Sequence, residues 1–268
     1  MTRNSWLRTG ALVAGLAAAG CHGPMGELVG RASDEWVRSY ELPPDGEIQV
    51  SATNGTIDLE GYDGKTVDVR AERIAHAVTD EAARELVSKI AINEEVAPDR
   101  VAIRTEGISG LLIGVSYQVK YHVRAPHSVV ARMRVTNGIV TAKRFSGHLI
   151  ATSTNGGIVG EEIGGKLEAR STNGAVRVAL QQVAAAGVTL RTTNGRVDLS
   201  LPASAKADLS AECRNGAVTV EGLSFEPNGE QSRRMVRGKL NGGGAPIDVE
   251  TTNGAVRIRS LAASNESS

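Results

Sequence analysis

Cysteine is nearly absent from this sequence, because 268 residues contain only Cys21 and Cys213. A disulfide framework needs cysteines in pairs, and beyond Cys21 only one remains. We therefore expect packing and hydrogen bonds, rather than cross-links, to stabilise the chain.

Aromatic residues are also scarce, at 3% of the sequence, whereas glycine occurs 31 times. The core of a conventional β-sandwich relies on Trp, Tyr and Phe, which each bury a large apolar area. A narrow core between closely stacked strands can be filled by Val, Ile, Leu and Ala instead. The composition favours the narrow core.

Long apolar runs are lacking too, apart from Leu12 to Ala19, which follows Arg3 and Arg8. This run is shorter than the roughly 20 residues that a membrane-spanning helix requires. A basic start, a short apolar stretch and small residues at its end are typical of a secretory signal. We predict that residues 1–20 form a signal peptide and that the protein is exported.

Cys21 follows this segment directly. The sequence Ala18-Ala19-Gly20-Cys21 resembles a bacterial lipobox, although Ala18 replaces the usual Leu. We predict acylation of Cys21, which would anchor the protein to a membrane surface without spanning it. The expected location is the cell envelope, periplasmic or on the outer surface. The alternative is ordinary signal-peptidase cleavage near the same place, which gives a secreted soluble protein.

Neither sign of charge is in excess, since 30 basic residues face 30 acidic ones. Removal of residues 1–20 takes away Arg3 and Arg8 and leaves 28 against 30. Nucleic-acid-binding proteins usually show a basic excess or a basic stripe. We therefore predict no nucleic-acid partner.

The most prominent feature present is a repeated Thr-Asn-Gly turn. Thr precedes Asn in six of seven copies, and the exception is Arg214. The spacings from the second copy onward are 18, 18, 21, 21 and 38 residues, and the last is close to two units of 19, as if one had lost its turn. The seven asparagines are Asn54, Asn137, Asn155, Asn173, Asn194, Asn215 and Asn253.

Apolar and polar residues alternate on both sides of each turn. The positions six and four before the Asn, and three and five after it, are mostly Val, Ile, Leu or Ala. This period of two predicts a short strand on each side of the turn, with one face in the core.

Two architectures fit such turns, because Asn and Gly both tolerate positive φ. Units of 18–21 residues favour an all-β solenoid, or β-helix, whose coils have three short faces and whose Asn amides stack as a ladder. The alternative is an antiparallel meander of Asn-Gly hairpins. The substitution Asn173→Ala would cost about 1–3 kcal/mol in a buried ladder and less than about 0.5 kcal/mol at an exposed hairpin tip.

The stretch between Asn54 and Asn137 departs from the repeat. Strands are expected at 66–74, 101–103 and 117–123, with one short helix near 80–89 that is capped by Thr79 or Asp80 and covers an end of the solenoid. The predicted organisation is a linker over 21–35, one β-repeat domain over 36–260 and a disordered tail over 261–268.

Three features in this order resemble the bacterial DUF4097 family of adhesin-like β-strand-repeat proteins. They are Val67-Asp-Val-Arg-Ala71, the helix from Asp80 to Lys89, and Tyr121-His-Val-Arg-Ala-Pro126 followed by serial Thr-Asn-Gly copies. The likeness covers about residues 36–260. It implies a β-solenoid exported to the cell envelope, with no established reaction and no agreed ligand residues.

No residue pattern indicates a catalytic, metal or cofactor site. The histidines lie in separate segments without metal-ligand spacing. Cys213 occupies a position where other repeats have small residues such as Ser153, so we predict a core residue rather than a nucleophile. Outward acids such as Asp58, Asp198 and Asp248 alternate with arginines, which indicates charge pairing between strands.

These observations predict a non-enzymatic, adhesin-like envelope protein that acts as a binding or structural scaffold on a membrane surface. Its expected partners are the membrane, through Cys21, and an envelope protein or glycan that the sequence does not name. The alternative is a polysaccharide-binding or polysaccharide-active β-helix. That class would need clustered carboxylates for catalysis or an aromatic stripe for sugar stacking, and the outward repeat positions show neither.

Overall fold

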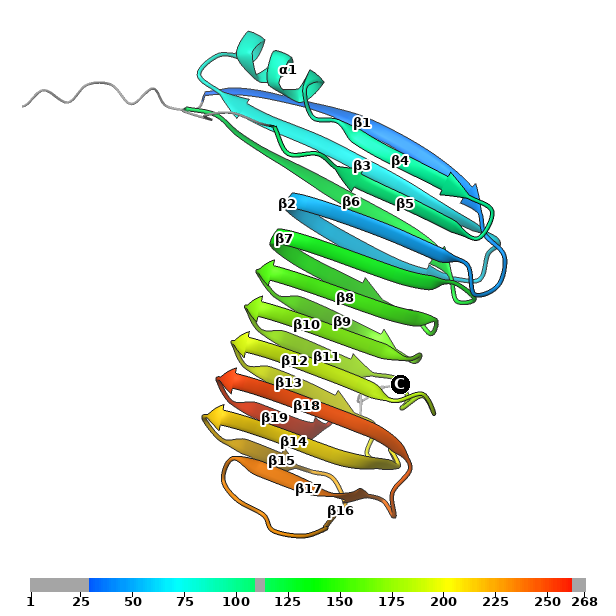
Figure 1. Cartoon of the computed structure of the whole chain (residues 1–268), viewed down its shortest axis with the longest axis vertical. Helices are drawn as coiled ribbons and strands as arrows, with labels where there is room; N and C mark the ends of the chain where they lie inside the picture. Colours follow the sequence, from blue (N-terminus) through cyan, green and yellow to red (C-terminus); the bar gives the residue numbers. More distant parts are fainter. Residues whose placement is uncertain (1–28, 109–113, 262–268) are drawn as a thin grey trace, which may run out of the picture.

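The protein is a long stack of flattened coils, seen in a computed structural model that describes residues 29–108 and 114–261 (Figure 1). The strands of the described residues join into one 19-stranded sheet that folds into two facing layers. The predicted all-β solenoid is therefore confirmed. The predicted signal peptide, Cys21 and the tail beyond residue 261 lie outside the described residues.

Each repeat forms one coil, which consists of two strands joined at the Asn-Gly turn. The first strand of a coil lies in one layer and the second in the opposite layer (Figure 1). The strand pairs of the complete coils are β8 (His148–Asn155) with β9 (Ile158–Ile163), β10 (Leu167–Asn173) with β11 (Val176–Leu180), β12 (Val188–Asn194) with β13 (Val197–Leu201), β14 (Ala207–Asn215) with β15 (Val218–Glu221), and β18 (Ala245–Asn253) with β19 (Val256–Ser260).

The expectation of three faces per coil was wrong, because each coil has two. In the coil of β8 and β9, only residues 164–166 connect β9 to the next coil, which leaves too few residues for a third strand. The two layers therefore face each other directly and share one thin core.

Neighbouring coils pair in parallel and in register. Asn173 lies beside Asn155 on one side and beside Asn194 on the other. In a hairpin, the two strands of one repeat would pair with each other antiparallel. Here each strand of a repeat pairs in parallel with the corresponding strand of the neighbouring coil. The antiparallel meander is thereby excluded, and each Asn-Gly pair is a corner between layers.

The N-terminal part broadens the stack. Two long strands, β2 and β7, bend at their Asn-Gly corners and contribute to both layers. Additional strands extend each layer beyond β2: β5 and then β4 in one layer, β6, β3 and then β1 in the other. The bounds are β1 (Gly30–Glu41), β2 (Glu47–Tyr62), β3 (Thr66–Ala77), β4 (Ile92–Ala97), β5 (Arg100–Thr105), β6 (Ser116–Pro126) and β7 (Val130–Lys143).

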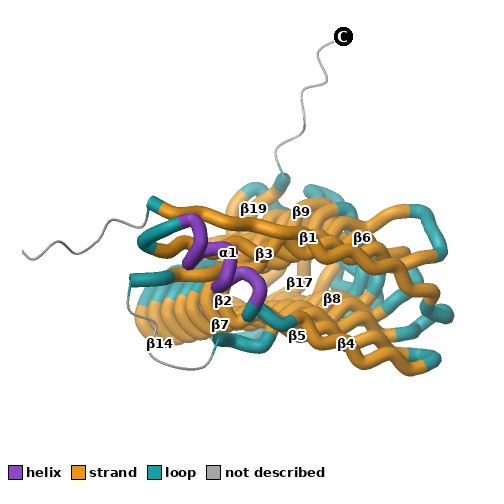
Figure 2. Tube along the Cα trace, turned by 90° about the horizontal axis from the view of Figure 1, so that it is seen from above, coloured by secondary structure: helices purple, strands orange, loops and turns teal. Residues whose placement is uncertain are grey.

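Helix α1 (Asp80–Ser88) lies across the N-terminal end of the stack, as predicted (Figure 2). The Thr79 hydroxyl caps it by accepting a hydrogen bond from the Ala82 amide at 3.2 Å. Leu86 and Val87 pack against Ala75 of β3 and close this end of the core. The predicted linker ends too late, because β1 begins at Gly30 and pairs with β3 along its length.

The C-terminal coil does not lie at the end of the stack, so the interpretation of the 38-residue interval was wrong. Strand β18 pairs with β12 on one side and β14 on the other, which inserts Asn253 between Asn194 and Asn215. The intervening residues form an antiparallel pair, β16 (Phe225–Pro227) and β17 (Met235–Leu240), which covers the outer edge of β14 (Figure 1). The chain makes the outermost corner at Asn215, forms this cap, and then returns to insert the coil of Asn253 inside it.

The core contains small and medium apolar side chains arranged in rows along the stack. The residues three positions after each Asn form one buried row: Ile57, Val140, Ile158, Val176, Val197, Val256 and Val218, in stacking order. Aromatic residues enter only where the layers widen or turn, as with Tyr121 and Phe145. The narrow core predicted from the low aromatic content is present.

Candidate functional site

The seven predicted turn asparagines form one continuous ladder. From Asn137 onward, each side-chain amide nitrogen donates to the Oδ1 of the preceding asparagine in the stack, at 2.8–2.9 Å. The order along the stack is Asn54, Asn137, Asn155, Asn173, Asn194, Asn253 and Asn215. The amides are mostly solvent-exposed, and every bond joins two members of the ladder. The ladder therefore builds the scaffold rather than a ligand site.

Exposure lowers the expected contribution of each ladder residue. Asn173 donates to Asn155 and accepts from Asn194, whereas Asn54, at the end, only accepts. A net contribution of about 0.5 kcal/mol per solvent-accessible bond gives a loss of about 1 kcal/mol for Asn173→Ala and about half of that for Asn54→Ala. Urea denaturation of both variants measures these losses. Equal losses at the two positions would contradict the assignment of two ladder bonds to Asn173 and one to Asn54.

A second ladder runs just inside the first. Hydroxyls two residues before the turn asparagine donate to the carbonyl oxygen of the glycine one coil away: Ser153 to Gly138, Ser171 to Gly156, Thr192 to Gly174 and Thr251 to Gly195, at 2.8–3.0 Å. The sequence showed only that small residues occupy this position. Their buried hydroxyls explain why Ser and Thr recur there, because they satisfy the glycine carbonyl at four corners.

Cys213 takes the same inward position in its coil. It is 1% exposed, and burial raises the pKa of its thiol. A thiol with a raised pKa is a poor nucleophile at neutral pH. The geometry agrees with the prediction of a small core residue.

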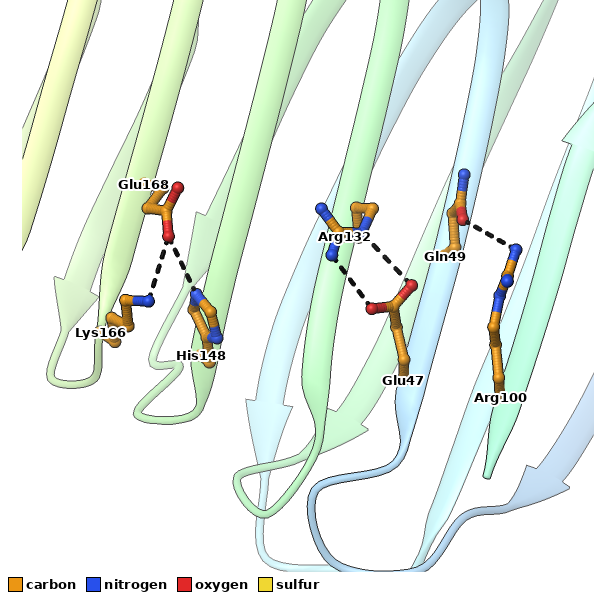
Figure 3. Close-up of polar contacts among 7 residues, drawn as sticks. All are labelled: Glu47, Gln49, Arg100, Arg132, His148, Lys166 and Glu168. Carbon is orange, nitrogen blue, oxygen red and sulfur yellow. Dashed lines mark hydrogen bonds and ion pairs between the residues drawn. The ribbon is translucent and has the colours of Figure 1, made fainter. Parts of the chain in front are cut away.

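Outward charges form pairs between coils, as predicted. On the layer that contains β2, β7 and β10, Glu47 accepts from Arg132 at 3.1 Å, and the Glu168 carboxylate lies 3.2 Å from Lys166 (Figure 3). Further along this layer, Asp248 accepts from Arg191 at 2.9 Å. The pairs Glu47–Arg132 and Asp248–Arg191 connect neighbouring strands, whereas Lys166 and Glu168 lie two residues apart in one coil.

His148 belongs to this paired surface but has an unusual environment. Its Nε2 atom is buried without a hydrogen-bond partner among the described residues, and the Glu168 Oε1 atom lies 3.5 Å away (Figure 3). Burial and the Lys166 ammonium lower the pKa of His148, against the opposing effect of Glu168. The neutral imidazole is therefore the form that the fold favours.

This preference makes stability depend on pH. Because the folded-state pKa is lowered, the unfolded chain takes up the proton first, and the free energy of unfolding falls as pH drops below about 6.5. The loss is at most about 1.4 kcal/mol per pH unit for one group. The variant His148→Gln should lose less stability between pH 7.5 and 5.5 than the wild type, measured by urea denaturation. An identical pH dependence would show that His148 does not contribute.

The opposite layer carries a different arrangement, a hollow of about 400 Å³ on the outer surface of β9, β11, β13 and β19. Ala179 and Ser200 are its small outward residues. Four arginines line it: Arg177 on β11, Arg196 just before β13, and Arg257 and Arg259 on β19. We call this feature the arginine hollow.

Two of these arginines share a single carboxylate. Asp198 lies 2.9 Å from Arg196 and 3.7 Å from Arg177, and its side chain is 19% exposed. Arg259 donates to the Ser200 hydroxyl at 3.1 Å. The sole other acid that lines the hollow is Glu161, which pairs with Lys143 at 2.8 Å. Four guanidinium groups against two carboxylates give the hollow a formal charge of +2.

The fold and these surfaces can now be compared with known proteins. A family model described as Toastrack DUF4097 matches residues 45–259, which is most of the chain. The chain belongs to the DUF4097 family. The resemblance stated from the sequence is therefore confirmed, and the match covers the coils, the N-terminal sheet extension apart from β1, and the inserted C-terminal coil.

A solved structure agrees with this DUF4097 fold. A candidate cell adhesion protein from Clostridium sporogenes is 15% identical, with a TM-score of 0.51, over 86% of this chain and 100% of that one. A candidate adhesin from Bacteroides fragilis is 12% identical, with a TM-score of 0.33, over 85% of this chain and 97% of that one. No curated protein matches the sequence. The likeness to the Clostridium sporogenes structure shows the fold alone.

The described residues of this DUF4097 protein hold no group of three or more His, Cys, Asp or Glu side chains that could bind a metal. They also hold no helix long and apolar enough to cross a membrane. Sequence reasoning identified the ladder but missed the arginine hollow. It treated the outward arginines only as pairing partners of acids such as Asp198, because it did not place the C-terminal coil beside β13.

Proposed function

We propose that this DUF4097 protein is a non-enzymatic binding scaffold of the bacterial cell envelope, held at a membrane surface through an acyl chain on Cys21. The observation that carries the proposal is the continuous ladder of seven in-register coils. It holds outward side chains in fixed rows, about 4.8 Å apart from coil to coil. Such rows suit contact with an extended partner along the stack.

The position of Cys21 supports attachment close to the membrane. Nine residue steps separate Cys21 from Gly30, where β1 begins, and they reach at most about 30 Å. The N-terminal end, which α1 covers, would therefore face the bilayer, and the capped C-terminal end would point away from it. A lipid chain contributes about 0.8 kcal/mol per buried methylene, so acylation anchors the protein without a membrane-spanning segment.

Fractionation of cells that produce the full chain or its Cys21→Ser variant tests the anchor. Wild-type protein should sediment with membranes and incorporate radiolabelled palmitate, and the variant should appear in the soluble exported fraction without label. Sedimentation of Cys21→Ser with membranes would contradict the lipid anchor.

The non-enzymatic part of the proposal is tested by incubation of the purified protein with acidic and neutral polysaccharides. We expect no increase in reducing ends over buffer. Hydrolysis by the wild type that Asp198→Ala abolishes would overturn the proposal in favour of a polysaccharide-active β-helix. Asp198 is the carboxylate to test because it lies in the hollow.

A further inference from the structure

We propose that the arginine hollow binds the carboxylate groups of an acidic polysaccharide. This inference rests on the proposed binding function and names a site and a ligand class for it. The hollow combines three features: a concentration of guanidinium groups, a floor of small side chains, and an open position on a flat outer layer.

The guanidinium groups are arranged across adjacent strands. Arg177, Asp198 and Arg257 are register partners on β11, β13 and β19, so they form one row across three coils. The two arginines of this row are separated by two strand spacings, about 10 Å. Asp198 lies between them and contacts Arg177, while Arg196 reaches the same carboxylate from the corner side.

These arginines keep unused hydrogen-bonding capacity. A guanidinium carries five N–H donors in a planar fork, which matches a carboxylate in two-point contact. Asp198 offers two oxygens to two guanidinium groups, and Arg259 donates to one hydroxyl. Arg177 and Arg257 are both exposed. Donors that face solvent are therefore available to a second carboxylate, which the positive charge attracts.

The floor gives such a ligand room. Ala179 and Ser200 are register partners on β11 and β13, and they occupy outward positions between longer side chains. A carboxylate that reaches this floor meets the four arginines on the walls of the hollow and the Ser200 hydroxyl beneath it. The open side of the hollow lets a polymer pass across neighbouring coils.

The surroundings favour an acidic polysaccharide over other anions. The lining contains no aromatic side chain, so bases or neutral sugars would find no stacking platform. The exposed large apolar side chains of the described residues are Val29, Val37, Val78, Val96, Ile139 and Leu261. None lines the hollow, so an anionic lipid surface would gain no apolar insertion there. The hollow therefore offers mainly charged contacts to a ligand. An extended polymer could lie along the flat outer layer that surrounds it.

Binding of the full chain, purified in detergent, to immobilised polygalacturonate tests the inference by biolayer interferometry in 50 mM salt. Wild-type protein should bind polygalacturonate and not neutral dextran, and binding should weaken steeply with added salt. The double variant Arg177→Gln/Arg257→Gln should bind at least ten times more weakly. The matched control, Arg170→Gln/Arg191→Gln on the opposite layer, should stay within twofold of the wild type.

A variant that is expected to bind more tightly distinguishes ligand recognition from damage to the fold. The variant Asp198→Asn removes the carboxylate that competes inside the hollow, so its affinity for polygalacturonate should rise about threefold. Loss of affinity in Asp198→Asn, no binding by the wild type, or equal losses in the two double variants would overturn the inference. Binding to phosphatidylglycerol vesicles instead of polygalacturonate would also overturn it, in favour of a lipid surface.

The anchor experiment is independent of this one. The variant Arg177→Gln/Arg257→Gln should still sediment with membranes through Cys21. Loss of polysaccharide binding with intact fractionation would therefore leave the envelope anchor standing, whereas a soluble wild type that still binds polygalacturonate would contradict the anchor alone.

Discussion

The substitution Gly156→Ala should destabilise the protein by about 3 kcal/mol or more. A Cβ atom at position 156 would lie 1.9 Å from the carbonyl oxygen of Gly138 on the neighbouring coil, and the backbone there has a φ of +154°. Relief requires the corners to separate. Separation would break the bond from Ser153 to Gly138 and the bond from Asn155 to Asn137.

The matched control for this change is Gly164→Ala. A Cβ atom at position 164 would meet only side-chain atoms, the nearest at 3.3 Å, so the expected loss is below about 1 kcal/mol. Guanidinium denaturation of both variants measures the difference. A Gly156→Ala protein within 1 kcal/mol of Gly164→Ala would contradict the close stacking of corners.

The substitution Phe145→Ala should cost about 3–5 kcal/mol. Phe145 lies between β7 and β8, where the chain turns from one coil to the next, and its side chain is 0% exposed. Its ring fills the wide end of the core and lies 6.1 Å from the ring of His127, between centroids. Because protein cores are closely packed, loss of the ring would leave a cavity that the surrounding residues do not fill.

The variant Phe145→Leu serves as the control for this site. Leu retains most of the buried apolar volume, so the expected cost is about 1.5 kcal/mol. Thermal and chemical denaturation of the two variants measure the ratio of their effects. If Phe145→Ala cost no more than Phe145→Leu, the ring would not be a core residue.

Much of the scaffold was predictable because short sequence patterns determine its corners and strands. The Asn-Gly pair marks a corner, alternation marks two strands, and a fixed period marks stacking, so Asn137, Asn155, Asn173 and Asn194 could be placed in order from the sequence. The number of faces was not predictable from the period. That number depends on how many residues the turn at the far end of the coil uses, as residues 164–166 show.

The position of the last coil could not be predicted from local rules. Asn253 matches Asn194 and Asn215 equally well, because every coil presents the same polar corner and a similar apolar face. The signal lay in the residues between the last two copies, which lack the repeated turn and contain Gly222, Gly242 and Gly243 with positive φ. They form the cap that sends the chain back into the stack.

The arginine hollow depends on this return. Arg257 and Arg259 reach the hollow only because β19 lies beside β13. In the linear order of coils β15 would lie there, and it carries Thr219 and Glu221 at the equivalent positions. The order of the coils is therefore the central claim on which both the scaffold and the proposed ligand site rest.

Disulfide formation between pairs of engineered cysteines tests that order directly, in a background of Cys21→Ser and Cys213→Ser. Adjacent corners are about 4.8 Å apart, within the 4.4–6.8 Å that a disulfide spans between Cα atoms, and corners two coils apart are not. The pair Asn194→Cys/Asn253→Cys should form an intramolecular disulfide under mild oxidation, detected by non-reducing electrophoresis and mass spectrometry, and Asn194→Cys/Asn215→Cys should remain reduced. A disulfide in the second pair and not in the first would show that the coils stack in sequence order.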